Sequence, residues 1–368
     1  MEFINVKLSD IGEVVGGATP STKNPDNYDG NIAWITPKDL AGYNKVYISK
    51  GERNITEMGF KSCSTKILPK NSVLFSSRAP IGYVAISEND LCTNQGFKSI
   101  IPNNKIDYKF LYYLLKHNKN YIASKGSGST FKEVSGSVMK GIELSIPKNI
   151  HDQKKISKIL FDIDKKIELN NEINNNLHEL EKNLYKEYFK DLSDDNTKKL
   201  GELCNIKYGK GLPTTKIEKE GYPVYGGNGI IGYYHEFMYD NSQVLISCRG
   251  AASGNVIVSK PKSFVTNNSL ILECDRKYHY YLKQYSLDNY YYEYTTGSAQ
   301  PQITIDNIKD IVLSIPSDEL LESFNKQMEN LELKYFSNLE EISKLEQLRD
   351  TLLPKLMNGE IDLENIES

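Results

Sequence analysis

Hydrophobic and polar positions follow two different patterns along this 368-residue chain. In residues 1–150 and 197–316, short β-rich runs such as "SVLFSS" and "QVLISC" end at small polar residues, which is typical of strands. Glycine clusters such as "YGGNGIIGYY" (Tyr225–Tyr234) indicate tight turns. The stretch "KFLYYLLKHNKNY" (Lys109–Tyr121) has an apolar stripe at helical spacing. Both segments are therefore predicted to be α+β domains.

The second pattern lies in residues 151–196 and 317–368, where long stretches rich in Leu, Glu and Lys predict two long helices. Alternate steps of four and three residues trace a mostly apolar stripe along each helix, as in a coiled-coil seam. The first stripe contains Ile156, Leu160, Ile163, Ile167, Asn170, Asn174, Leu177 and Leu184. The second contains Phe324, Met328, Leu331, Tyr335, Asn338, Ile342, Leu345 and Leu352.

We expect the two seams to pack on each other as an antiparallel coiled coil, with the two domains at its ends in a pseudo-two-fold arrangement. A buried Asn at a seam position fixes the register at a cost in stability, and Asn174 is expected to lie near Asn338. Two domains held at a fixed separation would suit a ligand with a repeating pitch, such as DNA. The alternative is that each helix is a plain amphipathic helix packed on its own domain.

The two predicted domains share landmarks in one order, which indicates an internal duplication. Each domain also ends in Gly-Ser, a polar stretch, a short apolar run and Ile-Pro, immediately before its helix. The matched pairs are "LSDIGEVVGG" (Leu8–Gly17) with "LGELCNIKYGKG" (Leu200–Gly211), "VLFSSRAPIGYVAI" (Val73–Ile86) with "VLISCRGAASGNVIV" (Val244–Val258), "CTNQGFKSII" (Cys92–Ile101) with "VTNNSLIL" (Val265–Leu272), "FLYYLLK" (Phe110–Lys116) with "YHYYLKQ" (Tyr278–Gln284), and "KGSGSTFKEVSGSVMKGIELSIP" (Lys125–Pro147) with "TGSAQPQITIDNIKDIVLSIP" (Thr296–Pro316).

The net charge of −3 is distributed unevenly among these segments. Residues 1–150 carry a net charge of +6 and residues 197–316 carry +2, whereas residues 151–196 carry −3 and residues 317–368 carry −8. Such asymmetry allows the domains to approach phosphate groups while the acidic helices stay away from them. The ordinary alternative is that long helices are acidic because charge keeps them in solution.

Several classes of protein are disfavoured by composition. No apolar run approaches the roughly 20 residues needed to cross a membrane, and the N-terminal "MEFINVKLSD" lacks the features of a signal peptide. The five cysteines are scattered and odd in number, which argues for reduced thiols and against a disulfide framework or zinc. The five histidines show no metal-binding spacing. We therefore expect a cytoplasmic protein with no metal site and no membrane segment.

The chain also lacks the familiar catalytic motifs. "GKGLPTT" (Gly209–Thr215) lacks the Lys-Ser/Thr of a nucleotide-binding loop, and there is no G-x-S-x-G nucleophile motif. "NPDNY" (Asn24–Tyr28) is similar to the Asn-Pro-Pro-Tyr of adenine methyltransferases but lacks the second proline. We predict a non-catalytic chain with no cofactor of its own. An enzyme with an unrecognised site is an alternative, which S-adenosylmethionine binding or nuclease activity by the purified chain would favour.

Five stretches together resemble the specificity subunit of type I restriction-modification systems. They are "GGATPSTKNPDNYDGNIAWITPKDL" (Gly16–Leu40), "YPVYGGNGIIGYY" (Tyr222–Tyr234), "LISCRGAASGNV" (Leu245–Val256), "GSAQPQI" (Gly297–Ile303) and "LRDTLLPKLMNGEI" (Leu348–Ile361). They extend over almost the whole chain, and the resemblance rests on their order together with the two helices.

The resemblance implies a function that composition could not show. Residues 1–150 and 197–316 would be target-recognition domains that each read one half of a bipartite site in double-stranded DNA. Residues 151–196 would be the first spacer helix, and residues 317–368 the second spacer helix with a C-terminal tail. The helices would set the distance between the half-sites and bind two methyltransferase subunits. Those partners would carry S-adenosylmethionine and methylate adenine at N6, and a motor-nuclease subunit would join the complex.

Polar loop residues at matched repeat positions are the candidates for DNA contact, since Asn and Gln can pair with adenine and Arg and Lys with guanine. Arg78 and Arg249 occupy the same landmark, although a structural Arg that props the loop is an equal alternative. The other candidates are Thr19, Ser21, Thr22, Lys23 and Lys38 in the first copy, and Lys210, Asn228, Gln300 and Gln302 in the second. The tyrosine cluster at 278–294 could stack on a flipped base, but packing within a helix is the preferred interpretation.

A rival of a different class is a bivalent scaffold that binds protein or glycan through two α+β modules on a coiled coil. Such a scaffold would show no salt-dependent DNA binding and would need no methyltransferase partner.

Overall fold

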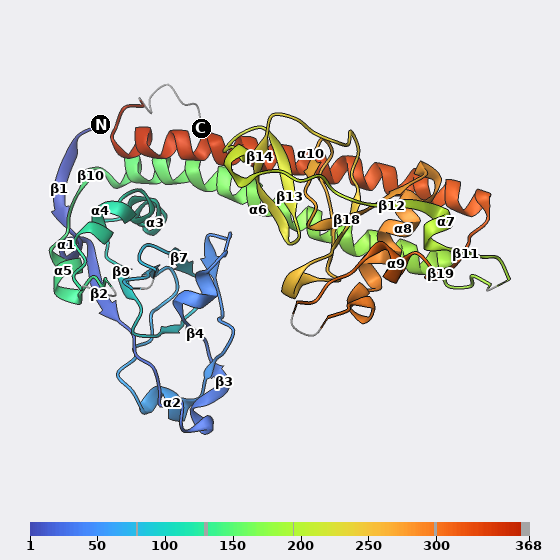
Figure 1. Ribbon diagram of the computed structural model, residues 1–368. Helices are drawn as coiled ribbons and strands as arrows, with labels where there is room; N and C mark the ends of the chain where they lie inside the picture. The colour runs from blue at the N-terminus through green and yellow to red at the C-terminus, as the bar shows by residue number, and fades with distance from the viewer. Residues whose placement is uncertain (79, 129–131, 194, 298–299, 362–368) are drawn as a thin grey trace. The chain divides into compact units, whose positions relative to one another are not determined.

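Each copy of the repeat is closed by the pairing of its first strand with its last. The computed structural model describes residues 1–78, 80–128, 132–193, 195–297 and 300–361 (Figure 1). In the first copy β1 (Phe3–Lys7) pairs antiparallel with β10 (Glu143–Pro147). In the second copy β11 (Thr197–Lys199) pairs in the same way with β19 (Val312–Ser314). The N-terminal strand of each copy therefore fixes the point at which the chain leaves for its long helix.

Two compact units divide the chain: Met1–Glu172 with Asn338–Ser368, and Ile173–Ser337. Both long helices, α6 (Ile150–Phe189) and α10 (Asp318–Met357), cross this division. Each unit therefore contains one α+β copy and a part of each helix. Residues 362–368 of the predicted C-terminal tail lie outside the described residues.

The first unit is built on a five-stranded sheet with the order β2–β9–β6–β7–β5, beside the parallel pair β4–β8. The helix α3 covers the sheet, with Phe110, Leu111 and Leu114 in its core. The strands are β2 (Gly12–Gly16), β3 (Tyr28–Ile32), β4 (Trp34–Ile35), β5 (Tyr47–Ile48), β6 (Val73–Phe75), β7 (Val84–Ser87), β8 (Cys92–Thr93) and β9 (Lys98–Pro102). The helices are α1 (Leu8–Ile11), η1 (Pro25–Asn27), η2 (Pro37–Leu40), α2 (Glu57–Lys61), α3 (Tyr108–His117), α4 (Lys119–Ser124) and α5 (Gly136–Gly141).

The second unit repeats this plan with a four-stranded sheet, β12–β18–β15–β16, and a three-stranded sheet, β14–β13–β17. Its strands are β12 (Cys204–Tyr208), β13 (Tyr222–Gly226), β14 (Gly229–Tyr234), β15 (Val244–Ser247), β16 (Val256–Val258), β17 (Phe264–Val265) and β18 (Ser269–Cys274). Its helices are α7 (Leu200–Leu203), η3 (Thr214–Lys216), η4 (Gly250–Ala252), α8 (Arg276–Asp288), η5 (Tyr291–Tyr294) and α9 (Ile305–Ile308). The predicted α+β class is confirmed in both copies.

The short helices α1 and α7 show how closely the copies agree. The Leu8 amide donates to the Ile142 carbonyl at 3.0 Å, and the Leu200 amide donates to the Ile311 carbonyl at 2.8 Å. Both leucines are fully buried. The first turn of each copy is therefore anchored to the segment that precedes its last strand.

The helical stretch predicted over Lys109–Tyr121 is two helices, α3 and α4, which meet at Asn118. The Asn118 side-chain amide donates to the Leu114 carbonyl at 2.9 Å. Asn competes in this way for backbone groups that a continuous helix would use. The apolar stripe alone did not reveal the break.

Within the first unit, α6 and α10 run antiparallel (Figure 1). The Arg349 guanidinium contacts Asp164 at 2.9 Å, and the Asn170 amide donates to Glu341 at 2.8 Å. Moving forward along α6 thus means moving backward along α10. The same order holds in the second unit, where ring centroids lie 4.7 Å apart for His178 and Tyr335 and 5.4 Å apart for Tyr188 and Phe324.

The predicted seam residues lie on the inner side of these helix pairs. Nine are buried: Ile156, Leu160, Ile167, Asn170, Asn174, Phe324, Met328, Asn338 and Ile342. The others are half-buried: Ile163, Leu177, Leu184, Leu331, Tyr335, Leu345 and Leu352. The proximity of Asn174 and Asn338 stays a prediction. No helix among the described residues is long and apolar enough to cross a bilayer.

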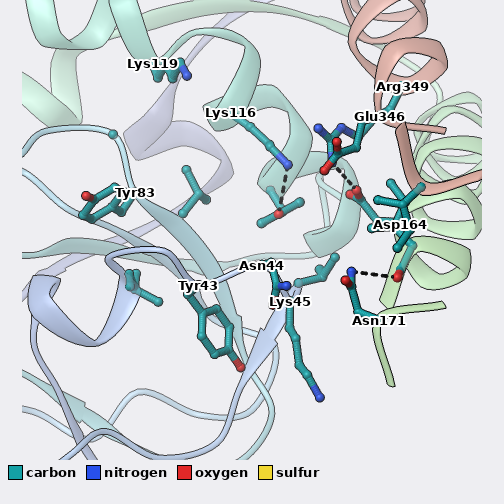
Figure 2. Close-up of a pocket in the computed structure, with 17 residues that line it drawn as sticks. Tyr43, Asn44, Lys45, Tyr83, Lys116, Lys119, Asp164, Asn171, Glu346 and Arg349 are labelled. Atoms are coloured by element: carbon teal, nitrogen blue, oxygen red, sulfur yellow. Dashed lines mark hydrogen bonds and ion pairs between the residues drawn. The ribbon is translucent and has the colours of Figure 1, made fainter. Parts of the chain in front are cut away.

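A buried ion pair lies where α3, α6 and α10 meet in the first unit. Asp164 of α6 accepts hydrogen bonds from Arg349 of α10 at 2.9 Å and from the Tyr113 hydroxyl of α3 at 2.7 Å. Figure 2 shows Arg349 and Asp164 facing each other beside Lys116, whose ammonium lies 3.4 Å from the Tyr112 hydroxyl. Burial lowers the pKa of Lys116, because a charged group is less stable away from water.

The second unit has a related ion cluster with a different source of positive charge. Lys283 of α8, with a side chain 6% exposed, lies 3.3 Å from Glu181 of α6 and 3.5 Å from Glu332 of α10. The Gln284 amide also donates to Glu181 at 3.1 Å, and the Tyr280 hydroxyl donates to Glu332 at 3.0 Å. In both units, α3 or α8 thus reaches a carboxylate on the long helices.

Candidate nucleic-acid interface

Matching loops carry the two candidate arginines. Arg78 follows β6 and Arg249 follows β15. Each loop then turns through a glycine in the left-handed region, Gly82 at φ 102° and Gly254 at φ 94°. The Gly82 amide donates to Ser76 at 3.0 Å, and the Gly254 amide to Ser247 at 2.9 Å. Such backbone favours glycine, so the two loops share this turn, although the second loop has one more residue and contains η4.

The Gly-Ser stretch before each long helix is paired at its two ends, beside this loop. Ser127 and Glu133 exchange backbone hydrogen bonds at 3.0 and 2.9 Å. Glu133 in turn forms a β-bridge with Arg78. Residues 129–131 of the quoted repeat lie outside the described residues.

The second copy closes in the same way. Thr296 and Gln302 exchange hydrogen bonds at 2.9 and 2.8 Å, and Gln302 bridges to Arg249. Residues 298–299 lie outside the described part of the chain. We call these two paired positions, Ser127 with Glu133 and Thr296 with Gln302, the exit hairpins. They bring the Arg landmark and the Gly-Ser landmark of each copy into one place, although these are distant in sequence.

Four candidates of the second copy line one open hollow of about 720 Å³. They are Asn228, Arg249, Gln300 and Gln302, and all four side chains are exposed. A guanidinium and three amides provide donors and acceptors of the type that reads base edges in the major groove. The fifth candidate, Lys210, is exposed outside this set, and its amide donates to the Val265 carbonyl at 2.9 Å.

The corresponding arginine of the first copy is held by an acid. Arg78 lies 3.8 Å from the Glu133 carboxylate, which also pairs with Lys98 at 3.3 Å. Glu133 stands where the second copy has Gln302. Arg78 is therefore partly engaged in supporting its own exit hairpin, whereas Arg249 makes no ion pair with any described residue and faces the hollow.

Hydrogen bonds from two aromatic side chains fix the backbone of the first polar loop. The Trp34 indole donates to the Ala18 carbonyl at 3.1 Å, and the buried Tyr28 hydroxyl donates to the Pro20 carbonyl at 2.7 Å. A Cβ on Gly17 would lie 2.1 Å from the Thr93 carbonyl, so that position admits no larger residue.

The side chains of the candidates in this loop differ in their contacts. Ser21, Thr22 and Lys23 are exposed. The Thr19 hydroxyl instead donates to Gln95. Lys38 lies in η2 and pairs with Glu52 at 2.7 Å, so its contacts are separate from those of the loop.

Some polar residues of these surfaces escaped the sequence reasoning. Gln95 contacts Thr19, and Lys98 shares Glu133 with Arg78. Ser247 and Asn268 line the hollow with Arg249. The matched "TNQG" and "TNNS" stretches contain Gln95 and Asn268. Both residues could have been predicted as candidates, because they are polar and follow a strand at the same place in each copy.

The chain was compared with known proteins. The family model described as "Type I restriction modification DNA specificity domain" matches residues 2–179 and 193–350. The type I restriction enzyme MjaIX specificity subunit of Methanocaldococcus jannaschii is 34% identical, over 98% of this chain and 94% of that protein. The EcoprrI specificity subunit of Escherichia coli is 26% identical, over 85% of this chain and 83% of that protein.

A solved structure shares the fold. The crystal structure of a type I restriction-modification S subunit from Mycoplasma genitalium has a TM-score of 0.65 and 20% identity, and the alignment covers 97% of this chain and 96% of that one.

Proposed function

Since the chain belongs to the type I restriction-modification DNA specificity family, we propose that residues 1–150 and 197–316 each read one half of a bipartite DNA site. The family assigns a role in DNA sequence specificity, that of a recognition subunit and not of a catalytic one. The observation that supports two readers is the paired Arg loop and exit hairpin, built once in each copy from the same backbone contacts.

The remaining parts of the proposal concern geometry and partners. Residues 151–196 and 317–368 act as spacer helices that set the distance between the half-sites. They also bind two methyltransferase subunits, which hold S-adenosylmethionine and methylate adenine at N6, and a motor-nuclease subunit completes the complex in the cytoplasm. The antiparallel contacts of α6 and α10 within each unit support the role of a rigid spacer.

The candidate residues of each copy are proposed to contact the DNA. Arg249, Asn228, Gln300 and Gln302 read bases from the hollow, because their side chains are exposed together. In the first copy the proposed contacts are Thr19, Ser21, Thr22, Lys23, Lys38 and Arg78. Phosphate contacts would fix the register, and base contacts would supply the specificity.

The test is a genome-wide map of N6-methyladenine in the host, with and without this gene. We expect one asymmetric bipartite motif to lose methylation on both strands when the gene is absent. Replacing residues 1–150 by the same region of a relative should then change one half-site alone. If no motif changes while the methyltransferase is expressed, the DNA-reading role fails and the bivalent scaffold becomes the better account.

The isolated chain is expected to bind DNA weakly. Its two recognition segments carry net charges of only +6 and +2, and phosphate neutralisation dominates the affinity of most DNA-binding proteins. Tight and site-specific binding by the isolated chain at physiological salt, measured by fluorescence anisotropy, would contradict this expectation.

A further inference from the structure

An exposed tyrosine precedes the exit hairpin in each copy. Tyr121 is 42% exposed and Tyr290 is 59% exposed. Tyr121 stands before Ser127 by the same number of positions as Tyr290 stands before Thr296. The next residue is fully buried in both copies: Ile122 at 0% and Tyr291 at 1%. The buried neighbour anchors the segment, so the tyrosine in front of it is left free to face outward.

The backbone confirms that these positions are equivalent. The Gly126 amide donates to the Ala123 carbonyl at 3.1 Å, and the Thr295 amide donates to the Tyr292 carbonyl at 3.1 Å. Tyr121 lies within the α-helix α4, whereas Tyr290 is the N-cap residue of the 3-10 helix η5. The two copies have thus diverged in local helix type while keeping an exposed phenol at one place.

Each of these segments packs on the Arg loop of its own copy. A Cβ on Gly82 would lie 3.2 Å from Lys119, two positions before Tyr121. A Cβ on Gly254 would lie 2.8 Å from the Tyr292 backbone nitrogen. The Tyr291 amide also donates to the Gly254 carbonyl at 3.2 Å. The two tyrosines therefore lie beside the proposed reading loops, on segments that lead straight into the exit hairpins.

The rings and hydroxyls of these tyrosines are available to a ligand. Neither the Tyr121 nor the Tyr290 hydroxyl makes a hydrogen bond to another residue within the described ranges. The Lys125 ammonium lies 4.9 Å from the centroid of the Tyr121 ring. The Tyr290 ring stacks on Tyr292, itself 51% exposed, with centroids 5.7 Å apart. One copy thus pairs its phenol with a cation, and the other pairs it with a second phenol.

We propose that Tyr121 and Tyr290 each contact the sugar–phosphate backbone of duplex DNA at the edge of one half-site. The ring packs on a deoxyribose and the hydroxyl donates to a phosphate oxygen, a contact that tyrosine makes in many protein–DNA interfaces. Lys125 adds a cation to the same phosphate in the first copy. This inference rests on the proposed function, because it places the tyrosines on the face that reads DNA.

The test uses the full chain in complex with its methyltransferase and a duplex that carries both half-sites. We expect Tyr121→Ala and Tyr290→Ala each to weaken binding about tenfold, and the Phe variants about threefold, in line with loss of one hydrogen bond. The Phe variants retain the ring, so they keep the test valid if an Ala variant folds poorly. Tyr43→Ala and Tyr43→Phe are the controls, because Tyr43 is 37% exposed but its hydroxyl donates to the Tyr47 carbonyl and is therefore not free for a ligand.

A second measurement separates the two copies and identifies the phosphate. Lys125→Gln should reduce the slope of log affinity against log salt by about one, whereas Tyr290→Phe should leave this slope unchanged. Placing a neutral methylphosphonate at the contacted phosphate should remove the difference in affinity between the wild-type chain and the Tyr121→Phe variant.

Three results would overturn the proposal. Wild-type affinity in both Ala variants would do so and would leave the proposed function standing, provided the unmodified complex still selects its site. Loss of methyltransferase from the purified complex, with DNA affinity retained, would show that these tyrosines face a protein instead. An unmodified complex that does not distinguish its site would remove the proposed function together with the tyrosine contact.

Discussion

The two units each contain a buried ion cluster between the α+β copy and the long helices, but the clusters differ in the residue that carries the positive charge. In the first unit, the cation that faces the buried carboxylate comes from the long helix α10, as Arg349 against Asp164. In the second unit it comes from the α+β copy itself, as Lys283 between Glu181 and Glu332. The repeat therefore preserves a charged junction between each domain and the long helices, but not the residue that neutralises it.

The difference follows from one exchange along the seam. When the two long helices are aligned as copies of the repeat, Glu181 of α6 matches Arg349 of α10. With an acid at that step, the second junction holds two carboxylates that face each other, and a cation must come from elsewhere. Lys283 supplies it at the position where the matched stretch of the first copy has Leu115. A buried charge without a partner costs several kcal/mol, so these two differences depend on each other.

The largest expected effect is that of Lys283→Met. This variant leaves Glu181 and Glu332 without their shared cation, and the free energy of unfolding should fall by about 4 kcal/mol. Urea unfolding followed by far-UV circular dichroism measures the loss. Lys182→Met is the control, because Lys182 is a half-exposed partner of Asp288 at 3.5 Å, and surface pairs contribute little. A loss no larger than that of the control would mean that the cluster does not depend on Lys283.

Arg349→Met should cost less, about 3 kcal/mol, because Asp164 keeps the hydrogen bond from Tyr113 at 2.7 Å. The single tryptophan, Trp34, is buried in the first unit, so its fluorescence during urea unfolding reports on that unit. Adding Asp164→Leu and Tyr113→Phe should restore much of the stability, since a buried pair can often be replaced by apolar groups and the Tyr113 hydroxyl would otherwise lose its acceptor. A triple variant that is less stable than Arg349→Met would contradict this account.

The second unit should also lose stability as the pH falls from about 7 towards 5. Burial lowers the pKa of His279. The nearby Glu332 raises this pKa, whereas the positive charges of Lys283 and Arg276 lower it further. The unfolded chain then binds a proton near the ordinary pKa of about 6.5 while the folded chain does not, so stability is present above that pH and is lost below it. His279→Gln should flatten this part of the stability curve in urea titrations at several pH values. An unchanged curve would show that other groups govern it.

The smallest effect on stability is expected for Lys38→Met. Lys38 forms an exposed pair with Glu52 at 2.7 Å, and such pairs hold little stability. The melting temperature should therefore stay at the wild-type value, whereas methylation of one half-site should decrease if Lys38 contacts DNA as proposed. Glu52→Gln serves as the control that breaks the same pair but keeps the cation. A matching loss of methylation in both variants would assign the effect to the pair and not to a DNA contact.

Much of the fold could be predicted because the main sequence features occur in both copies of the repeat. The matched stretches around Arg78 and Arg249 form equivalent loops, and the periodic apolar positions of residues 151–196 and 317–368 form α6 and α10. Periodicity and repetition are local properties that a sequence carries directly. Family membership followed from the order of these local features.

The features that could not be predicted depend on contacts between distant segments. Nothing near Lys283 in the sequence indicates that it will meet Glu181 and Glu332, and the tyrosine cluster gave no sign of which rings would be buried. Tyr291 is buried while its neighbours Tyr290 and Tyr292 are exposed, because its ring packs in the hydrophobic core of the second unit and its hydroxyl lies 2.9 Å from that of Ser286. The four candidates around the hollow could be proposed from their residue types and loop positions. That they line one hollow together could not be predicted, because they come from distant segments.

The exit hairpins have a consequence for how such a protein can change over generations. Each is pinned at its base by two backbone hydrogen bonds, Ser127 with Glu133 and Thr296 with Gln302. Backbone bonds form whatever the side chain is, so exposed residues at these paired positions, such as Thr296 and Gln302, can be substituted without changes in the hydrophobic core or the helices. Selection could therefore alter what each domain recognises one substitution at a time, while the scaffold that every recognition event depends on is inherited unchanged.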